Sequence, residues 1–371
     1  MNILSIVTTK DLRSGGPIYL CNSQKKFLQK KSYIKIISLN KISFYKFLLY
    51  FFGFKNKKIN NVLLKFNLVH FHEVWNIKHH LLAFKLRRLS IPFIFSVHGH
   101  FDKWSVNNNY LIKKFFLYIF KKNFIHSSGL QISSHDELKE ARIFLNEKSI
   151  TFFLISNGVE LNNDQSYFKK KEFDYNKIKL LFFGRIHYKK GINLILETLK
   201  ELTDCNLNYS LTIVGPSDEA YLKKIHNLIN SLNLNSYVSI LEPVFDNIQK
   251  INVFNNHDIF LLPSFEEADS IALKEALACG VPVVISKQCR LNDVEDYHCG
   301  VIIENNRSED LTLAIKKISN KNLINIMSKN SVKLIHQKYT SDIMNKNFFE
   351  IYIDVMNGTR FAKNWSCNNI L

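Results

Sequence analysis

Two carboxylates eight positions apart, Glu267 and Glu275, give the clearest indication of chemistry in this 371-residue sequence. They belong to SFEEADSIALKEALACGVPVVIS (264–286), where a buried strand gives way to a polar turn and then to a helix. Asp269 or Ser270 can cap that helix. Free N–H groups at a helix start attract phosphate, and carboxylates accept hydrogen bonds from vicinal hydroxyls. The stretch therefore predicts a site for a phosphorylated, hydroxyl-rich ligand.

The same residue types also have a purely structural explanation. Glu267 could cap the helix and Glu275 could face solvent, because acidic residues are common in first helical turns. Arg185 and Lys190 follow another predicted strand, and this cationic pair could neutralise phosphate or belong to an ordinary basic surface. His98, at a predicted strand end, could touch a ligand or lie in the core. Both alternatives stay open at this point.

Histidines crowd the segment between residues 70 and 100, where a zinc site is conceivable. The six are His70, His72, His79, His80, His98 and His100. His70 and His72 would share one face of a strand. The HExxH arrangement is absent and no cysteine lies nearby, so hydrogen bonds alone can account for these side chains. We predict no metal site and no cofactor.

Short apolar runs alternate with helical stretches along the chain, which is typical of βαβ units with parallel sheets. The first series of predicted strands covers 3–7, 33–39, 68–72, 92–98, 130–134 and 151–156, and the second covers 179–184, 211–215, 237–241, 258–263, 281–286 and 300–304. A polar linker, 161–177, separates the two series. This pattern predicts an α/β protein of two Rossmann-like domains whose parallel sheets face a ligand cleft.

The domain boundaries follow from the two series of strands. We expect an N-terminal domain over residues 1–160 and a C-terminal domain over residues 161–339. A C-terminal helix, about 340–371, is expected to pack back on the first domain.

The basic charge lies almost entirely in the first half of the chain. Residues 1–160 hold 25 Lys and Arg against 8 Asp and Glu, a balance of +17, whereas the remainder holds 25 against 24. Stretches 44–58 and 110–122 interleave aromatic residues with lysines, which suits anionic lipid headgroups or nucleic acid. Two core helices with solvated lysines would give the same pattern.

Cysteine usage and hydropathy indicate the compartment. The cysteines are Cys21, Cys205, Cys279, Cys289, Cys299 and Cys367, without a CxxC pair or a regular framework. Free thiols of this kind fit a reducing environment. The start, MNILSIVTTKDL, lacks a basic n-region, and no apolar run reaches the roughly 18 residues of a spanning helix. We therefore predict a cytoplasmic protein.

The opening motif also resembles a known family. E-x7-E followed by A-x-A-C-G-x-P-V looks like the signature of the retaining GT-B glycosyltransferases of family 4. FFGRIHYKKGINLILETL (182–199) resembles that family's Gly-Arg and Lys-Gly segment, and ISNGVE (155–160) resembles its interdomain segment. SGGPIYL (14–20) resembles its Gly-rich first loop, and VHGHFDKW (97–104) resembles the HG segment of members that build bacterial surface polysaccharides. Together these segments cover nearly the whole chain.

The resemblance implies a role for each matching residue. Arg185 and Lys190 would neutralise the diphosphate of a nucleotide-sugar as the glycosidic bond breaks, in place of a metal. Glu275 would bind ribose hydroxyls, Glu267 would lie beside the donor sugar, and His98 would touch the sugar or the leaving phosphate. Further donor contacts are implied at Gly184, Ser270, Ile271, Ala272, Gly15 and Gly16, and the last two would let the backbone approach the ligand closely.

One departure from the family pattern concerns the sugar pocket. The family usually has a Phe-Gly or similar pair where this chain has Asp269 and Ser270. Backbone amides there could still meet the sugar, but the added side chains would reshape the pocket. Glu267 and Glu275 are also not expected to act as the catalytic carboxylates of a glycosidase do, because the two glutamates of this family are not an acid and nucleophile pair.

The resemblance implies a retaining glycosyltransferase that acts on a glycan hydroxyl in capsule, O-antigen, lipopolysaccharide or exopolysaccharide biosynthesis. The expected acceptor is a glycan or a polyprenyl-diphosphate-linked acceptor. The resemblance places the acceptor side on the first domain and the donor side on the second. The basic first domain would rest on the inner face of an anionic membrane, and no nucleic-acid partner is expected. Two alternatives remain: a nucleotide-sugar epimerase of the same fold, and a non-catalytic scaffold that binds membrane or nucleic acid.

Overall fold

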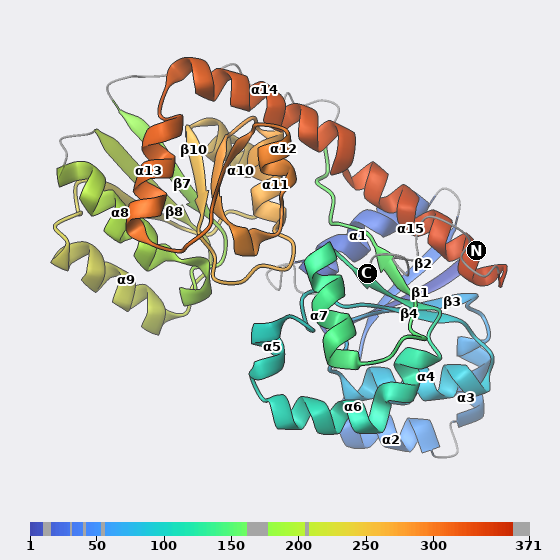
Figure 1. Ribbon diagram of the computed structural model, residues 1–371. Helices are drawn as coiled ribbons and strands as arrows, with labels where there is room; N and C mark the ends of the chain where they lie inside the picture. Colours follow the sequence, from blue (N-terminus) through green and yellow to red (C-terminus); the bar gives the residue numbers. More distant parts are fainter. Residues whose placement is uncertain are drawn as a thin grey trace. The chain divides into compact units, whose positions relative to one another are not determined.

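The computed structural model describes residues 1–9, 16–29, 32–39, 42–52, 56–161, 177–204 and 208–358 (Figure 1). It divides the chain into two compact units. The first contains Met1–Asn157 and the C-terminal segment from Ser341, and the second contains Gly158–Thr340. Each unit has one six-stranded sheet in which every pairing of strands is parallel.

The sheet of the first unit has the order β2-β1-β3-β4-β5-β6. Its strands are β1 (Asn2–Val7), β2 (Tyr33–Ser38), β3 (Leu68–His72), β4 (Phe93–Ser96), β5 (Gly129–Ile132) and β6 (Phe152–Leu154). Its helices are α1 (Gly16–Leu28), α2 (Phe44–Phe52), α3 (Asn56–Leu63), α4 (Ile77–Arg88), α5 (Lys103–Asn107), α6 (Tyr110–Ile125), α7 (His135–Leu145) and α15 (Ser341–Met356).

The sheet of the second unit has the order β12-β11-β10-β7-β8-β9. Its strands are β7 (Ile178–Phe183), β8 (Tyr209–Val214), β9 (Val238–Leu241), β10 (Ile259–Leu262), β11 (Val283–Ser286) and β12 (Gly300–Ile303). Its helices are α8 (Ile192–Asp204), α9 (Glu219–Ser231), α10 (Asn247–Asn255), α11 (Ile271–Ala278), α12 (Asp293–Asp296), α13 (Ser308–Ile318) and α14 (Lys321–Lys338). All twelve predicted strands are present, so the predicted α/β class with two Rossmann-like sheets is confirmed.

Both faces of the first sheet are buried, because helices cover each of them. Side chains on β1 alternate between two apolar clusters: Leu4 joins the one that contains α4 and α7, whereas Ile3 joins the one that contains α15. From α15, Phe348 and Tyr352 are fully or almost fully buried in that second cluster. The last described helix of the chain is therefore an integral part of the first unit.

The first helix begins earlier than expected. The Gly-rich segment 14–20 was expected to form a loop, but α1 already begins at Gly16. Pro17 explains this, since proline is well tolerated in the first turn of a helix. Gly15 lies outside the described residues, as do Cys205, Cys367 and most of the predicted linker 161–177. Within the described part of the chain, no helix combines the length and the apolarity needed to cross a bilayer.

Candidate active site

The pairing of β7 with β10 places two loops of the second unit side by side. Phe260 of β10 lies opposite Leu181 of β7, so the chain leaves both strands at the same edge of the sheet. The backbone N–H of Phe265 donates to the carbonyl of Lys189 across 2.7 Å, which joins the two loops. Gly191 has φ +72°, and a Cβ there would lie 2.2 Å from the carbonyl oxygen of Pro263. Only glycine allows this approach.

Ion pairs connect the same two loops side chain to side chain. Lys190 Nζ pairs with Glu267 Oε2, and Lys189 Nζ pairs with Glu266 Oε2 at 2.7 Å. All four side chains are largely buried, with exposed fractions between 12% and 22%. The structure thus brings together Lys190 and Glu267, two predicted site residues 77 positions apart in sequence.

Arg185 and Gly184 lie where the chain leaves β7. Gly184 has φ +151°, and a Cβ on the adjacent Gly215 would lie 1.8 Å from the Gly184 carbonyl oxygen, so the ends of β7 and β8 touch at backbone level. Arg185 is exposed. Partial burial, and then the Arg185 and Lys189 charges, lower the pKa of His187. A positive, glycine-lined edge of this kind suits an anionic ligand.

Helix α11 begins beside these loops. Ser270, and neither Asp269 nor Glu267, is its N-cap, and its hydroxyl accepts from the Leu273 N–H at 3.3 Å. Ile271 and Ala272 are the first two helical residues, whose N–H groups have no acceptor in a preceding turn. Glu275 is not solvent-exposed: it lies in an ion pair with Lys250 of α10, and its side chain is 12% exposed. The expectations that Glu267 caps the helix and that Glu275 faces solvent are therefore wrong.

A buried charge on α11 was not anticipated from the sequence. Lys274 is 1% exposed and pairs with Asp269, the residue that departs from the family pattern. Its ammonium also lies 4.5 Å from the ring centroid of Tyr339, whose hydroxyl donates to Asp293. Burial lowers the pKa of Lys274, and the Asp269 carboxylate opposes that shift. The available signal was the lysine within the largely apolar helix IALKEALA, nine residues before β11.

His98 belongs to the first unit, in the turn after β4, with a left-handed backbone (φ +51°). Its Nε2 lies 3.4 Å from Nδ1 of His72, and the two rings stack at 5.7 Å. His70 and His72 do share a strand face, with ring centroids 3.9 Å apart. His70 in turn contacts the Tyr352 hydroxyl at 2.8 Å and the Ser96 hydroxyl at 2.7 Å.

Burial keeps these histidines neutral. It lowers the pKa of His98 and of His80 to about 3, and that of His79 and of His100 to about 4. The pKa values of His70 and His72 also fall well below the usual range, through burial and then through neighbouring histidines. Among the described residues, no group of three or more His, Cys, Asp or Glu side chains is arranged to hold a metal ion.

Glu137 fixes the turn that carries His98, and we did not predict it. This carboxylate is fully buried at the start of α7, accepting from Gly99 N–H at 2.6 Å and from the N–H and hydroxyl of Ser133 at 2.6 Å each. Ser134 caps the same helix through the Glu137 N–H. The sequence S-x-x-E at 134–137 is a capping-box pattern and could have revealed it.

The comparisons with known proteins agree with this architecture. Residues 163–334, slightly under half of the chain and nearly all of the second unit, match the family described as Glycosyl transferases group 1. The chain is 26% identical over 253 residues to the capsular polysaccharide biosynthesis glycosyltransferase CapM of Staphylococcus aureus, with 65% of each chain covered. Its matches span 55–65% of the length of the first curated relatives.

Two solved structures share the whole fold. The sucrose-phosphate synthase of Thermosynechococcus elongatus superposes with a TM-score of 0.77 at 16% identity, covering 96% of this chain and 100% of that one. Anabaena Alr3699/HepE in complex with UDP and glucose gives a TM-score of 0.74 at 16% identity, covering 94% and 98%. The chain therefore has the GT-B fold of two Rossmann-like domains. Its second unit carries the group 1 glycosyl transferase sequence pattern.

Proposed function

We propose that the protein is a glycosyltransferase that moves a sugar from a nucleoside diphosphate-sugar to a hydroxyl of a glycan. The observation that carries this proposal is the contact between Lys190 and Glu267 at the edge where β7 and β10 end, with Arg185 exposed beside it. A cation and a carboxylate held together there can bind a diphosphate and a hydroxylated sugar at the same time. CapM, named as a capsular polysaccharide biosynthesis glycosyltransferase, supports a role in surface polysaccharide synthesis.

In the proposed reaction the bond between the anomeric carbon and the diphosphate oxygen breaks. Arg185 and Lys190 stabilise the negative charge that develops on the leaving diphosphate, which gives catalysis without a metal. The acceptor hydroxyl attacks the same face of the sugar and transfers its proton to a leaving phosphate oxygen, so the anomeric configuration is retained. Glu275 accepts hydrogen bonds from the ribose, and the N–H groups of Ile271 and Ala272 approach the sugar.

His98 is proposed to contact the donor sugar or the leaving phosphate. Its imidazole is neutral when buried, so it can donate one hydrogen bond and accept one without bringing a charge. Glu137 would act on it as a positioning residue, because it holds Gly99 next in the chain. Gly16, at the start of α1, would leave room for the ligand, since none of the described residues has an atom within 4 Å of where its Cβ would be.

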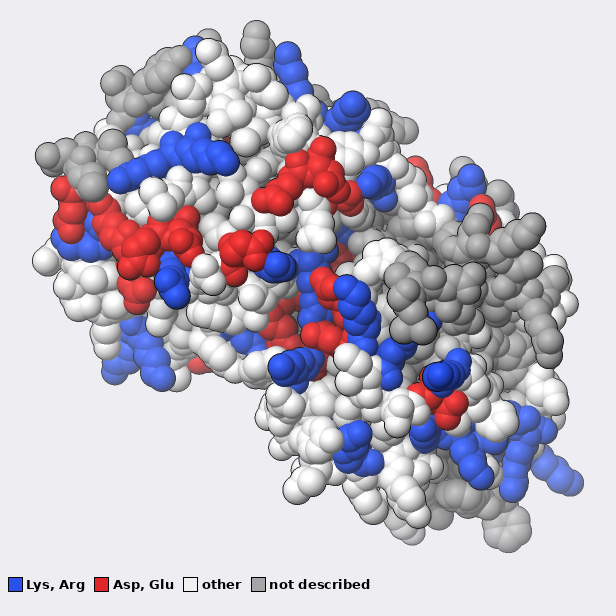
Figure 2. Space-filling model, viewed as in Figure 1, with Lys and Arg blue, Asp and Glu red and all other residues white. Residues whose placement is uncertain are grey.

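The same first unit is proposed to rest on an anionic membrane, at its cytoplasmic face, where a lipid-linked acceptor is available. Helix α6 exposes Leu111 (80%), Phe115 (65%) and Tyr118 (85%) among its lysines. A core helix with solvated lysines would not expose three large apolar side chains. On the face shown in Figure 2, Asp and Glu gather mainly over the second unit, whereas the first shows mostly Lys and Arg. Apolar anchors among cations suit an anionic lipid surface.

Liposome sedimentation tests the membrane part. At low salt, the wild-type protein should bind vesicles that contain anionic lipid, and Phe115→Ser with Tyr118→Ser should reduce binding strongly. Ile143→Ser is the matched control, because Ile143 of α7 is 80% exposed in the same unit. Binding that is equal in both variants and the wild type would exclude α6 as the contact, and no binding by folded protein would end the membrane proposal.

A thermal-shift and hydrolysis screen tests the transferase itself. UDP-, GDP-, dTDP- and CMP-sugars are added with EDTA present, and one diphosphate class should stabilise the protein, whereas the monophosphate CMP-sugars should not. Lys190→Ala should abolish the shift and lower turnover about 10²- to 10³-fold. Lys224→Ala, an exposed lysine of α9, is the control. A scaffold would show no nucleotide-dependent shift, and an epimerase would convert the nucleotide-sugar with no acceptor added.

A further inference from the structure

The first unit contains an open cavity of about 630 Å³ that the proposed reaction does not use. It lies between β1 and β2 on one side and helices α2 and α3 on the other. Most of its wall is apolar, including the buried side chains of Leu4, Leu39, Phe47 and Leu63. A volume of this size falls in the range of small-molecule pockets, about 300–1,000 Å³. The cavity can therefore hold an extended hydrocarbon chain.

Three lysines surround this apolar wall. Lys35 of β2, Lys46 of α2 and Lys58 of α3 line the cavity, and all three are exposed. No acidic residue is among the described residues that line it. An apolar interior with several exposed cations in its wall is complementary to an amphiphile with one anionic head.

The cavity also extends to the functional edge of the sheet. Leu39 and Ile42 line it, and both follow the carboxyl end of β2. That edge also carries the start of α1 after β1 and the His98 turn after β4. Lys78 Nζ of α4 donates to the carbonyls of Leu39 and Ile42 at 3.0 and 2.6 Å, so both residues are tied to α4. Ligands of open parallel sheets bind at this edge.

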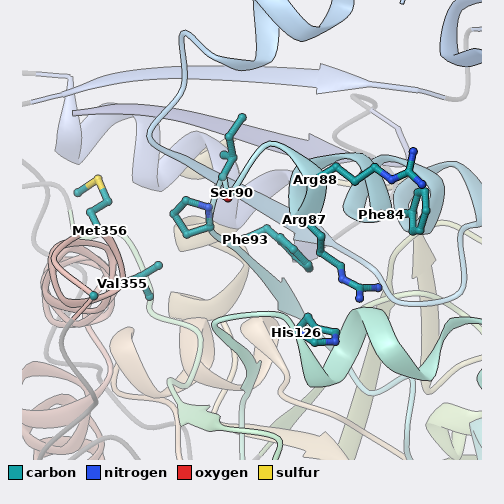
Figure 3. A pocket seen from close by; sticks show the side chains of 11 residues that line it. Phe84, Arg87, Arg88, Ser90, Phe93, His126, Val355 and Met356 are labelled. Atoms are coloured by element: carbon teal, nitrogen blue, oxygen red, sulfur yellow. The ribbon is translucent and has the colours of Figure 1, made fainter.

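A second cavity shows why location matters. It measures about 720 Å³ and is lined by Arg87, Arg88 and His126, and Figure 3 shows Arg87 and His126 pointing toward one another beside Phe93. Ser90 and Pro92 in its wall precede β4, and His126 precedes β5, so it opens at the amino ends of the strands. A ligand there would be on the opposite edge from His98.

We propose that the 630 Å³ cavity binds the hydrocarbon chain of an isoprenyl diphosphate, with the diphosphate held by Lys35, Lys46 and Lys58. The inference deepens the proposed function and rests on it for the biological role: the ligand is the lipid end of the acceptor. No covalent step takes place in the cavity. Its contribution is to hold the lipid while the glycan end extends past the carboxyl edge of the sheet.

Isothermal titration with farnesyl diphosphate, below its micelle concentration and with no donor present, tests the proposal. We expect one molecule bound per chain. Val62→Trp should fill the cavity and weaken binding at least tenfold, because Val62 of α3 lines it and is 44% exposed. Leu64→Trp is the matched control, since Leu64 follows the same helix, is 59% exposed and does not line the cavity.

The headgroup contacts have their own pair of variants. Lys58→Ala should weaken binding about fivefold, whereas Lys57→Ala, its exposed neighbour outside the cavity, should not. Farnesol and inorganic diphosphate should each bind much more weakly than farnesyl diphosphate. Equal binding of inorganic diphosphate would show a phosphate site alone, and equal binding of lysophosphatidate would show an acyl-lipid site. Either result overturns the proposal, as does the absence of binding.

The outcome separates the two proposals. If a nucleotide-sugar stabilises the protein and farnesyl diphosphate does not bind, only the cavity assignment fails. If farnesyl diphosphate binds and no nucleotide-sugar does, the amphiphile site stands and the transferase proposal fails. If Val62→Trp blocks the binding of farnesyl diphosphate and Lys58→Ala leaves it unchanged, the cavity recognises the apolar chain alone. A groove for a peptide or helix of another protein would behave in this way, and the proposal would be overturned.

Discussion

The carboxyl edges of the two sheets carry opposite kinds of polar chemistry. In the second unit the edge holds ion pairs: Lys190 and Glu267 join two loops, and Lys250 and Glu275 join helices α10 and α11. In the first unit it holds buried histidines that contact one another and are neutral, such as His72 and His98. One edge therefore presents charged side chains that can form ion pairs with a ligand. The other edge presents uncharged hydrogen-bonding groups.

This difference has a physical cause in burial. Lys190 and Glu267 keep exposed fractions of 22% and 13%, so an anionic ligand can reach the lysine and replace the glutamate as its partner. His72 is fully buried and His98 is half-buried, and burial lowers the pKa of both, so a positive charge on either would be poorly solvated. Charge in the second unit is thus available for ligand binding, whereas protonation in the first unit opposes folding.

Acid should therefore act on the first unit far more than on the second, and this is the largest effect we expect. The folded pKa values of the buried histidines lie below the unfolded value of about 6.5, so the unfolded chain takes up protons first. The free energy of unfolding should start to fall below pH 6.5 and keep falling toward pH 4, by about 1.4 kcal/mol per pH unit for each such histidine. Hydrogen exchange between pH 7.5 and 4.5 resolves the two units.

A single histidine variant sharpens this test. His79→Gln removes one buried imidazole whose pKa burial lowers to about 4, so the pH slope of stability should decrease. His126→Gln, at an exposed histidine of the same unit, is the control. Equal acid sensitivity of both units would contradict the contrast between the two edges.

Breaking the buried ion pair between Lys274 of α11 and Asp269 should have the next largest effect on stability. Lys274→Leu leaves the Asp269 carboxylate without its buried partner and should destabilise the second unit by about 3–5 kcal/mol. Adding Asp269→Asn should restore most of that loss, because no uncompensated charge then remains. Urea unfolding of both variants measures it. If the double variant is no more stable than Lys274→Leu, the pair is not an energetic unit.

Loss of Glu137 should have a smaller effect on the first unit. Glu137→Ala leaves the buried N–H groups of Gly99 and Ser133 without their acceptor, at a cost of about 2–3 kcal/mol. As a positioning residue for His98, it should also lower turnover. Glu137→Gln keeps one acceptor oxygen and should recover part of both losses. If Glu137→Ala is destabilised but its turnover is unchanged, Glu137 has a structural role only.

The smallest effect is expected at Lys189 and Glu266, the other of the two loop pairs. Lys189→Ala removes the partner of the largely buried Glu266 carboxylate and should cost about 1–2 kcal/mol, with little change in nucleotide binding. Comparison with Lys190→Ala in the same thermal-shift assay separates the two neighbouring lysines. If both variants lose nucleotide binding equally, the site depends on the charge of the loop and not on the position of Lys190.

Much of this molecule could be predicted from local sequence signals. The alternation of apolar strands and helices gave both sheets, since a strand buried on both faces reads as a continuous apolar run. S-x-x-E at 134–137 and Ser270 before α11 are likewise local, because a cap satisfies N–H groups within its own turn. Pro17 also fixed the true start of α1 at Gly16, which was placed wrongly in a loop.

The partners of the charged side chains could not be predicted in this way. Sequence alone indicated that Glu267, Glu275, Arg185 and Lys190 belong to one chemistry, through their types and spacing. Only the tertiary structure decided that Lys190 contacts Glu267, that Lys250 takes Glu275 and that Asp269 pairs with the buried Lys274. Residue types and local periodicity can be read directly from the sequence. Ion pairs and burial depend on which strands become neighbours, and the packing of the whole sheet determines that order.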